Sequence, residues 1–237
     1  MCLSSDRLSV STERPELILV PIYKKIMKQN KIAVIGGTGK SGTYLVAELL
    51  RRNIPVKLLL RTQSTFEISN PLVEIIRGDA RDYESIEELL EGCDAVISTL
   101  GQPKNEPSIF SDATQNILRV MKELKILRYI VTTGLNVDAP GDKKRESVRL
   151  ATAWMHQNYP KTTKDKQVEY ELLAESDIHW TLVRLPMIIQ TEEHFPVKVD
   201  LKDCPGENIS AADLACFLVD QLSSEEYIRK SPFIANS

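Results

Sequence analysis

Three glycines stand at equal spacing near the start of the chain, within Gly36-Gly37-Thr38-Gly39-Lys40-Ser41-Gly42. Such a turn lets the backbone bend sharply and approach an anion, and the start of a following helix offers unpaired N–H groups to a phosphate. The spacing is Gly-x-x-Gly-x-x-Gly, not the Gly-x-Gly-x-x-Gly of the standard dinucleotide fingerprint, and a glycine pattern alone is a weak signal. These residues are candidates for binding a pyrophosphate.

Two other interpretations of this turn compete with the dinucleotide site. Gly39-Lys40-Ser41 resembles the end of the nucleoside triphosphate loop Gly-x-x-x-x-Gly-Lys-Ser, but the first glycine of that motif would fall at Val34. The loop is then too short to wrap a β-phosphate, so a triphosphate site is not predicted. The second alternative is a glycine turn that only packs a strand against a helix.

The elements around the turn give it the context of a dinucleotide site. The apolar run Ile32 to Ile35 precedes it, and Val56 to Leu60 reads as a second buried strand further on. Between them, apolar residues recur at helical spacing: Leu45, Val46, Leu49 and Leu50. The unit is therefore a strand, a glycine turn, a helix and a second strand, which is the arrangement that binds a dinucleotide pyrophosphate.

The residue that ends the second strand indicates which dinucleotide fits. An acidic residue there would bind the adenosine ribose hydroxyls and repel a 2′-phosphate, whereas this chain has Arg61 followed by Thr62. A guanidinium can pair with that phosphate and stack on the adenine. We therefore expect NADP(H) as the cofactor, with a solvated arginine at a strand end as the alternative.

A third predicted strand, Val73 to Ile76, ends close to Asp79 and Ala80. The carboxyl ends of parallel strands border the ligand crevice of an open sheet, so we expect Asp79 beside the adenine. Its carboxylate could accept a hydrogen bond from the exocyclic amine. An Asp that caps the turn into the next helix is an equally good interpretation.

Two more strands should bring polar residues to the same edge of the sheet. The strand Cys93 to Thr99 leads to Gly101, so Thr99 and Gly101 are expected to line the cofactor. The strand Tyr129 to Thr133 ends in hydroxyl groups. Thr133 is a candidate for binding a substrate carbonyl near the nicotinamide, although a threonine at a strand end is also simply a good strand former.

The remaining pattern predicts one α/β domain with a doubly wound, Rossmann-type parallel sheet and helices on both faces. Residues 27–237 should form this domain, with a substrate pocket made by its C-terminal loops. The segment Asn136 to Lys164 is polar and contains Pro140-Gly141, so it is expected to be a long, mobile substrate loop. A helix from Lys166 to Glu175 and a strand from Trp180 to Leu185 are predicted to follow.

The composition narrows the classes of partner. The chain has 237 residues, 42% of them hydrophobic, and its 30 basic and 33 acidic residues give a formal net charge of −3. No basic face for nucleic acid is expected, no apolar run has the roughly 20 residues of a membrane span, and no cysteine or histidine spacing indicates a metal. We expect a cytoplasmic monomer or weak homo-oligomer with small-molecule partners, and an N-terminal appendage over residues 1–26.

Taken together, these motifs resemble the atypical short-chain dehydrogenase/reductases, and within them the NAD(P)H-binding, NmrA-like group that includes biliverdin reductase B-type flavin reductases. The resemblance runs from about Lys31 to the C-terminus and rests on GGTGKSG, Arg61, Gly78-Asp79, Thr132-Thr133, SDIHWTLVRLP and ISAADLACFL. It implies that NADP(H) is bound at Gly36, Thr38, Gly39, Lys40, Ser41, Gly42, Arg61, Asp79, Ala80, Thr99 and Gly101.

The resemblance transfers less completely to catalysis. Classical short-chain dehydrogenase/reductases use Tyr-x-x-x-Lys, in which the lysine holds the nicotinamide ribose and lowers the pKa of the proton-donating tyrosine. Lys166 matches the lysine, but Thr162 stands in place of the tyrosine, and Tyr159 could reach the site only if the loop rearranged. Thr133 and Lys166 remain the candidate catalytic residues.

A missing proton donor favours acceptors that need only hydride. We therefore expect an NADPH-dependent reductase that transfers hydride to a small conjugated acceptor, such as a flavin or a quinone. The alternative is a non-catalytic NADP(H)-sensing regulatory protein of the NmrA-like type.

Overall fold

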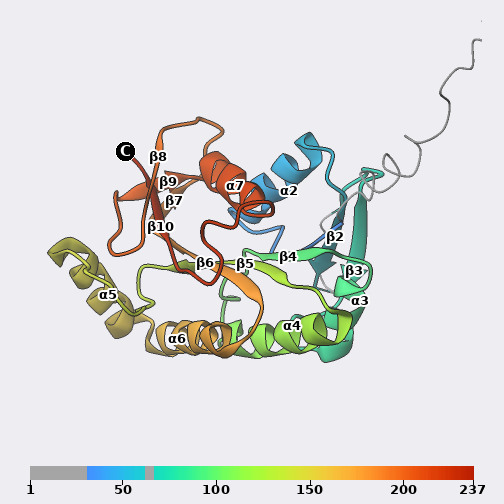
Figure 1. Ribbon diagram of the computed structural model, residues 1–237, viewed down its shortest axis with the longest axis horizontal. Coiled ribbons are helices and arrows are strands. Elements are labelled where there is room, and N and C mark those ends of the chain that lie inside the picture. Colours follow the sequence, from blue (N-terminus) through green and yellow to red (C-terminus); the bar gives the residue numbers. More distant parts are fainter. Residues whose placement is uncertain (1–30, 62–66) are drawn as a thin grey trace, which may run out of the picture.

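The structure is a computed structural model that describes residues 31–61 and 67–237. The predicted appendage, residues 1–26, and Thr62 lie outside the described residues. One eight-stranded sheet forms the centre of the molecule (Figure 1). In spatial order its strands are β3 (Val73–Arg77), β2 (Val56–Leu60), β1 (Ile32–Ile35), β4 (Ala95–Ser98), β5 (Arg128–Gly134), β6 (His179–Leu185), β10 (Phe233–Asn236) and β8 (Val197–Asp200).

The strands pair in parallel across this sheet, apart from β8, which runs antiparallel to β10. From β1 the chain winds outward through β2 to β3, then returns to β4 and winds the other way through β5 to β6. The carboxyl ends of β1 and β4 therefore border a topological switch point, where open α/β sheets bind their ligands. The predicted doubly wound sheet is confirmed.

Helices cover both faces of the sheet (Figure 1). On one face lie α2 (Gly42–Arg51) and α7 (Ala211–Asp220), and on the other lie α3 (Tyr83–Leu90), α4 (Phe110–Leu124) and α6 (Pro160–Glu175). A parallel pair of short strands, β7 (Met187–Ile189) and β9 (Asn208–Ser210), lies outside the main sheet. A further helix, α5 (Glu146–Asn158), projects at one end.

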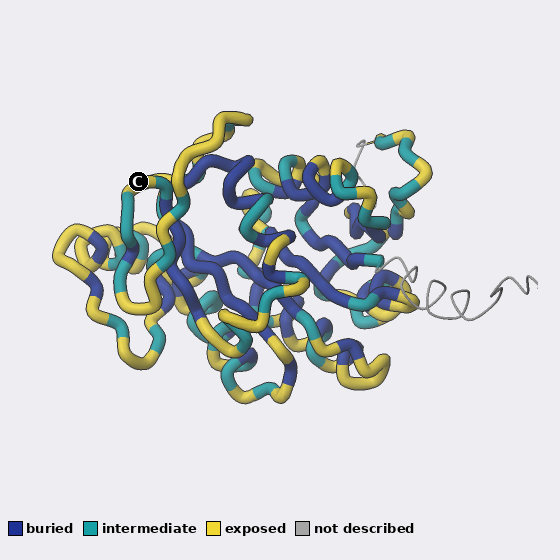
Figure 2. Tube along the Cα trace, turned by 45° about the horizontal axis from the view of Figure 1, so that its top comes forward, coloured by how far each residue is buried: buried dark blue, intermediate teal, exposed yellow. Residues whose placement is uncertain are grey.

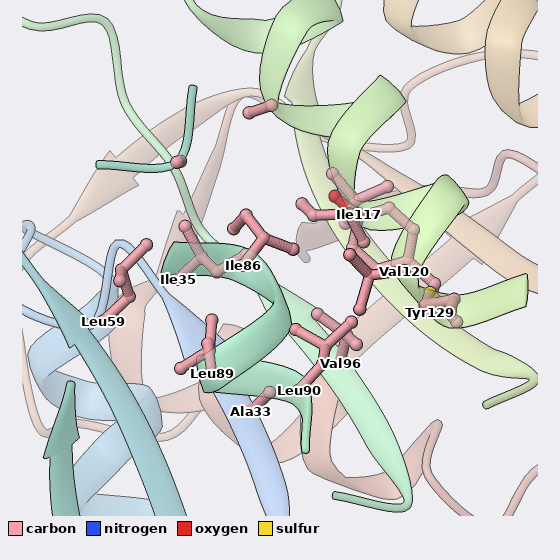
Figure 3. Close-up of a cluster of buried hydrophobic side chains, with 14 of the residues drawn as sticks. Ala33, Ile35, Leu59, Ile86, Leu89, Leu90, Val96, Ile117, Val120 and Tyr129 are labelled. Carbon is pink, nitrogen blue, oxygen red and sulfur yellow. The ribbon is translucent and has the colours of Figure 1, made fainter. Parts of the chain in front are cut away.

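The two faces explain why the strands read as unbroken apolar runs. Successive side chains of a strand point to opposite faces. In β1, Ala33 and Ile35 pack beneath α3 and α4, while Ile32 and Val34 pack beneath α2 and α7. Figure 3 shows the first of these clusters, with side chains of α3 and α4 meeting those of β1 and β4. Each fully buried aliphatic side chain of this kind contributes about 1.5–3 kcal/mol.

The segment Asn136 to Lys164 is not the long loop that its polar sequence suggested. It contains α5 and the first turn of α6, which begins at Pro160. Proline is favoured in the first turn of a helix because its missing N–H has no partner there. In α5 only Val148 is buried, and most of the helix is exposed at the left of Figure 2. The apolar periodicity that would have indicated the helix is therefore weak.

The residues before α5 are also fixed in place. Arg184, on β6, is completely buried, and its Nη1 donates to the Asp142 carboxylate at 2.6 and 2.8 Å. The buried Lys144 ammonium donates to the backbone carbonyls of Leu135 and Val137 at 2.8 and 3.0 Å. The turn that follows β5 is thus anchored to the core by buried charged side chains.

Candidate functional site

A cavity of about 660 Å³ opens at the switch point of the sheet. Its walls come from the carboxyl ends of β1, β2 and β3 and from the segment after β4. It brings together seven of the predicted cofactor residues: Gly36, Thr38, Gly39, Arg61, Asp79, Ala80 and Gly101. The cavity is thus formed by residues from four separate segments of the chain.

The glycine turn has the shape that the sequence required. Gly36 has a φ of +78°, and a Cβ there would lie 2.7 Å from the carbonyl carbon of Thr99. A Cβ on Gly42 would lie 2.1 Å from the carbonyl oxygen of Gly36. Side chains at these two positions would therefore force the turn, the start of α2 and the end of β4 apart.

The N-terminus of α2 offers free hydrogen-bond donors. Within the described chain, the backbone N–H groups of Lys40, Ser41 and Gly42 have no partner, and the Ser41 side chain makes no capping bond. Unpaired N–H groups at a helix start favour an anion such as a pyrophosphate. These three residues adjoin the turn, although none of them lines the cavity itself.

Thr99 is placed behind the turn and not in the cavity. Its side chain is buried, and its hydroxyl donates to the carbonyl oxygen of Gly36 at 3.2 Å. Its backbone N–H donates to Ile35 at 2.9 Å. Thr99 therefore holds the glycine turn against β4, a supporting position that the sequence reasoning did not anticipate.

A four-residue ionic network crosses the cavity wall. Arg61 Nη1 donates to Glu106 Oε1 at 2.7 Å, and Arg81 Nη2 donates to Glu106 Oε2 at 2.8 Å. Arg81 also donates to both carboxylate oxygens of Asp79, through Nε at 3.0 Å and Nη2 at 2.8 Å. This bond to Arg81 lowers the pKa of Asp79. Asp79 is thus already engaged by a neighbouring arginine.

Arg81 and Glu106 are the site residues that sequence reasoning missed. Arg81 follows Asp79 by two positions, a spacing that suits a turn whose backbone N–H donates to the Asp side chain, as it does here at 2.9 Å. Glu106 lies in a loop between β4 and α4, 45 residues from Arg61. No local spacing could have indicated that pairing.

A second, larger cavity of about 1090 Å³ adjoins the first. The segment 102–108 lies between them, and Gln102, Pro103, Lys104 and Glu106 line both. The amide nitrogen of Gln102 donates to the backbone carbonyls of Pro103, Glu106 and Pro107 at 3.1, 3.0 and 3.1 Å. One glutamine side chain therefore braces the wall that the two cavities share.

The far end of this wall is fastened to α6. The Asp165 carboxylate accepts from the Ser108 hydroxyl at 2.6 Å and from the backbone N–H of Phe110 at 2.8 Å. Because α4 begins at Phe110, this side chain caps α4 from a different helix. The opposite wall of the cavity includes Met155, Tyr159, Thr162 and Val168 from the region where α5 meets α6.

Tyr159 lies where α5 ends and α6 begins, not in a rearrangeable loop as predicted. It lines the second cavity together with Thr162, and its ring meets that of Trp154 edge-on at 5.7 Å. Both aromatic side chains are more than half exposed. Tyr159 therefore lines the cavity in the backbone conformation that the structure shows. It does not stand four residues before Lys166, where the Tyr-x-x-x-Lys motif has its tyrosine and this chain has Thr162.

Lys166 and Thr133, the candidate catalytic residues, line neither of these two cavities. Lys166 Nζ lies 3.6 Å from the centre of the Phe110 ring and donates to Glu169 and the Thr132 carbonyl, both at 3.4 Å. Burial raises the pKa of Glu169. The Thr133 hydroxyl is buried and has no hydrogen-bond partner. In the described structure, neither residue therefore contributes to the surface of these two cavities.

A parallel sheet with a glycine turn and a free helix N-terminus at its switch point defines a dinucleotide-binding protein of the Rossmann class. Comparison of the sequence with known families agrees with this. The chain belongs to the NAD(P)H-binding family, whose model matches residues 36–225. The predicted membership of an NAD(P)H-binding family is therefore confirmed.

Individual relatives are distant. The divinyl chlorophyllide a 8-vinyl-reductase of Arabidopsis thaliana is 23% identical over 91% of this chain and 55% of its own length. The chain spans about half the length of the first curated relatives that it matches. Their activities therefore do not transfer to this chain without a test.

Solved structures share the fold. A short-chain dehydrogenase/reductase from Veillonella parvula, crystallised with NADP, superimposes with a TM-score of 0.71 at 16% identity, covering 87% of this chain and 94% of the other. ChuY, described as an anaerobillin reductase from Escherichia coli O157:H7, gives 0.70 at 15% identity, covering 87% and 97%. At these identities the likeness establishes the fold and nothing more.

Among the described helices, none is both long and apolar enough to cross a membrane. In the same part of the chain, no group of three or more potential metal-ligating side chains comes together.

Proposed function

We propose that this protein is an NADPH-dependent reductase that transfers hydride to a small conjugated acceptor of the flavin or quinone kind. The observation that carries the proposal is the pair of adjoining cavities with one shared wall. The first contains the Arg61 guanidinium and adjoins the free N–H groups at the start of α2. The second is large, and most of the surface exposed within it is apolar. Names of similar proteins, which include several reductases, support the same class of reaction.

In this proposal the glycine turn and the start of α2 hold the cofactor pyrophosphate, and the cofactor supplies the hydride. Gly36, Thr38, Gly39, Lys40, Ser41 and Gly42 provide the turn and its N–H groups, Thr99 supports it, and Ala80 and Gly101 flank the adenosine. Arg61 faces the 2′-phosphate, which favours NADPH over NADH. Asp79 contributes by fixing Arg81 and not by binding the adenine amine.

The second cavity is proposed to take the acceptor. Its apolar lining suits a flat conjugated ring, because burial of such a ring removes apolar surface from water. Thr162 stands where related enzymes have a proton-donating tyrosine. An acceptor whose ring nitrogens take protons from solvent needs no such donor, whereas a ketone needs a positioned acid that contributes about 10²–10⁴-fold.

A second candidate function is NADP(H) sensing without catalysis. It is favoured by Lys166, whose ammonium is held among Phe110, Glu169 and the Thr132 carbonyl and not at either cavity. A sensor would bind the cofactor equally well but would have no use for an acceptor.

The test compares NADPH oxidation with a flavin, a quinone and a ketone, for the wild-type protein and for Tyr159→Phe. The proposal predicts turnover of the flavin or the quinone, little turnover of the ketone, and little effect of the substitution. Strong ketone reduction that Tyr159→Phe abolishes would instead make Tyr159 the proton donor.

A cytoplasmic location and a monomeric or weakly oligomeric state remain predictions from the sequence.

A further inference from the structure

Glu106 lies between Arg61, which lines the cofactor cavity, and Arg81, which lies next to the cavity wall. One of its carboxylate oxygens accepts from Arg61 at 2.7 Å and the other accepts from Arg81 at 2.8 Å. The two arginines come from different segments, Arg61 from the end of β2 and Arg81 from the turn after β3. The carboxylate thus connects two cations that the fold places together.

The charges of this cluster balance without any ligand. Two guanidinium groups carry two positive charges, and the carboxylates of Asp79 and Glu106 carry two negative ones. A phosphate monoester presents the same kind of acceptor oxygens to arginine as a carboxylate does, with a larger negative charge. Glu106 therefore fills the position that a phosphate beside Arg61 would need.

The two carboxylates of the cluster are not held equally. Asp79 accepts from the backbone N–H of Arg81 at 2.9 Å as well as from its guanidinium, and it lies within the turn itself. The Glu106 side chain is 32% exposed, and within residues 31–61 and 67–237 its ion-pair partners are the two arginines. Its backbone is braced separately, because Gln102 donates to the Glu106 carbonyl. Rotation of the Glu106 side chain would therefore break its bonds to the two arginines and leave the bond from Gln102 to its carbonyl intact.

We infer that Glu106 lowers the preference of this protein for NADPH over NADH. It acts as an internal counter-ion that the 2′-phosphate of NADPH must displace from Arg61 and Arg81. When NADH binds, Glu106 stays in place and accepts hydrogen bonds from the adenosine ribose hydroxyls. The inference rests on the proposed dinucleotide function, and it adds Arg81 as the second cation for the 2′-phosphate.

The expected effect of Glu106 on cofactor preference is opposite to that of Arg61. Arg61 alone favours NADPH, whereas Glu106 lowers that preference through competition and like-charge repulsion. Since exposed ion pairs are weak, displacement of Glu106 is expected to change affinity by a modest factor and not to block NADPH. The wild-type protein should therefore bind both cofactors, with a smaller preference for NADPH than two arginines would otherwise give.

The test is calorimetric titration of the full chain with NADPH and NADH, and with 2′,5′-ADP and 5′-AMP as probes that lack the nicotinamide. Glu106→Gln keeps the side-chain size and removes the charge. We expect it to bind NADPH and 2′,5′-ADP about three- to tenfold more tightly, and NADH and 5′-AMP no more tightly than wild type. Arg81→Gln should weaken NADPH and 2′,5′-ADP specifically.

Glu84→Gln is the matched control. Glu84 is an exposed carboxylate in the first turn of α3, close in sequence to Arg81. In the described part of the chain, the ion pairs of Arg61 and Arg81 are with Asp79 and Glu106 and not with Glu84. An unchanged ratio of NADPH to NADH affinity in Glu106→Gln, or the same ratio change in the control, would overturn the inference and leave the proposed function standing. Failure of the wild-type protein to bind either dinucleotide would overturn both.

Discussion

At the scale of single residues, Arg61 carries the expected cofactor preference. Its guanidinium is more than half exposed and lines the cavity, so it is available to a ligand phosphate. Arg61→Ala should weaken NADPH binding roughly tenfold to hundredfold and NADH binding little, because a charge-assisted hydrogen bond contributes about 1.5–3 kcal/mol. Calorimetry measures both, with the exposed Lys122→Ala on α4 as a charge-matched control. Equal losses for the two cofactors would contradict the assignment.

Asp142 is the residue on which the buried Arg184 depends. Asp142→Ala leaves a fully buried guanidinium without its carboxylate, and removing one partner of a buried pair costs about 3–5 kcal/mol. Urea denaturation should therefore show a loss of that order. Asp177→Ala, at an exposed position before β6, should change stability by less than about 0.5 kcal/mol. Similar small effects at both positions would show that the carbonyls around Arg184 suffice to stabilise it.

At the scale of elements, α5 should be the least protected of the long helices. It buries Val148 alone, whereas α4 buries Phe110, Ala113, Thr114, Ile117, Val120 and Met121. Helices with few buried contacts open locally at a small free-energy cost. Hydrogen–deuterium exchange should be faster by more than about tenfold in α5 than in α4. Equal protection would mean that another surface covers α5 in solution.

The same difference in burial explains which elements the sequence could predict. The strands Ile32–Ile35 and Val56–Leu60 are found at their predicted bounds, because both of their faces are buried and each reads as an unbroken apolar run. In α5 the apolar residues Leu150 and Trp154 face solvent, so its periodicity does not point to a core. Pro160 is a start signal for α6, but the polar segment before it has no apolar periodicity that would predict a helix.

The residues of the candidate site also differ in how far the sequence could predict them. The glycine turn and Arg61 belong to one continuous strand-helix-strand unit, so their spacing alone predicted their place at the sheet edge. Glu106 reaches Arg61 and Arg81 across 45 and 25 residues, and Asp165 reaches Ser108 across 57. Such contacts between loops depend on tertiary packing and leave no local pattern. Lys166 matches the lysine of a sequence motif, but a motif does not specify where a side chain points. In the structure the Lys166 ammonium lies at the Phe110 ring and lines neither cavity.

At the scale of the whole molecule, α2 packs against α7 on one face of the sheet, and an ionic cluster joins the two helices. Glu48 on α2 accepts from Arg51 and Arg52, and Arg52 also donates to Asp220 on α7. The bond from Arg51 is the main cause that lowers the pKa of Glu48 to about 2. A lowered carboxyl pKa adds stability above its ordinary value of 4.5, and that stability is lost as the pH falls toward 2.

Glu48→Gln should therefore destabilise the protein at pH 7 by about 1–2 kcal/mol, since the exposed arginine ends weaken the pair. The difference from wild type should shrink between about pH 5 and pH 2. Thermal denaturation followed across this range measures it, with Glu84→Gln as the control for loss of a carboxylate. A difference that does not depend on pH would indicate lost packing and not a lost charge.

The central claim for the whole molecule is that hydride passes from NADPH in the first cavity to a conjugated acceptor in the second. The most direct measurement is single-turnover oxidation of protein-bound NADPH on mixing with a flavin. The nicotinamide carbon that donates hydride carries two hydrogens, and the rate is compared for NADPH with deuterium at one position, at the other, and at neither. The account predicts that NADPH is oxidised, that deuterium at one of the two positions slows this step, and that a ketone reacts about 10²–10⁴-fold more slowly. Tightly bound NADPH that no flavin, quinone or ketone oxidises would contradict the account and assign the protein to NADP(H) sensing.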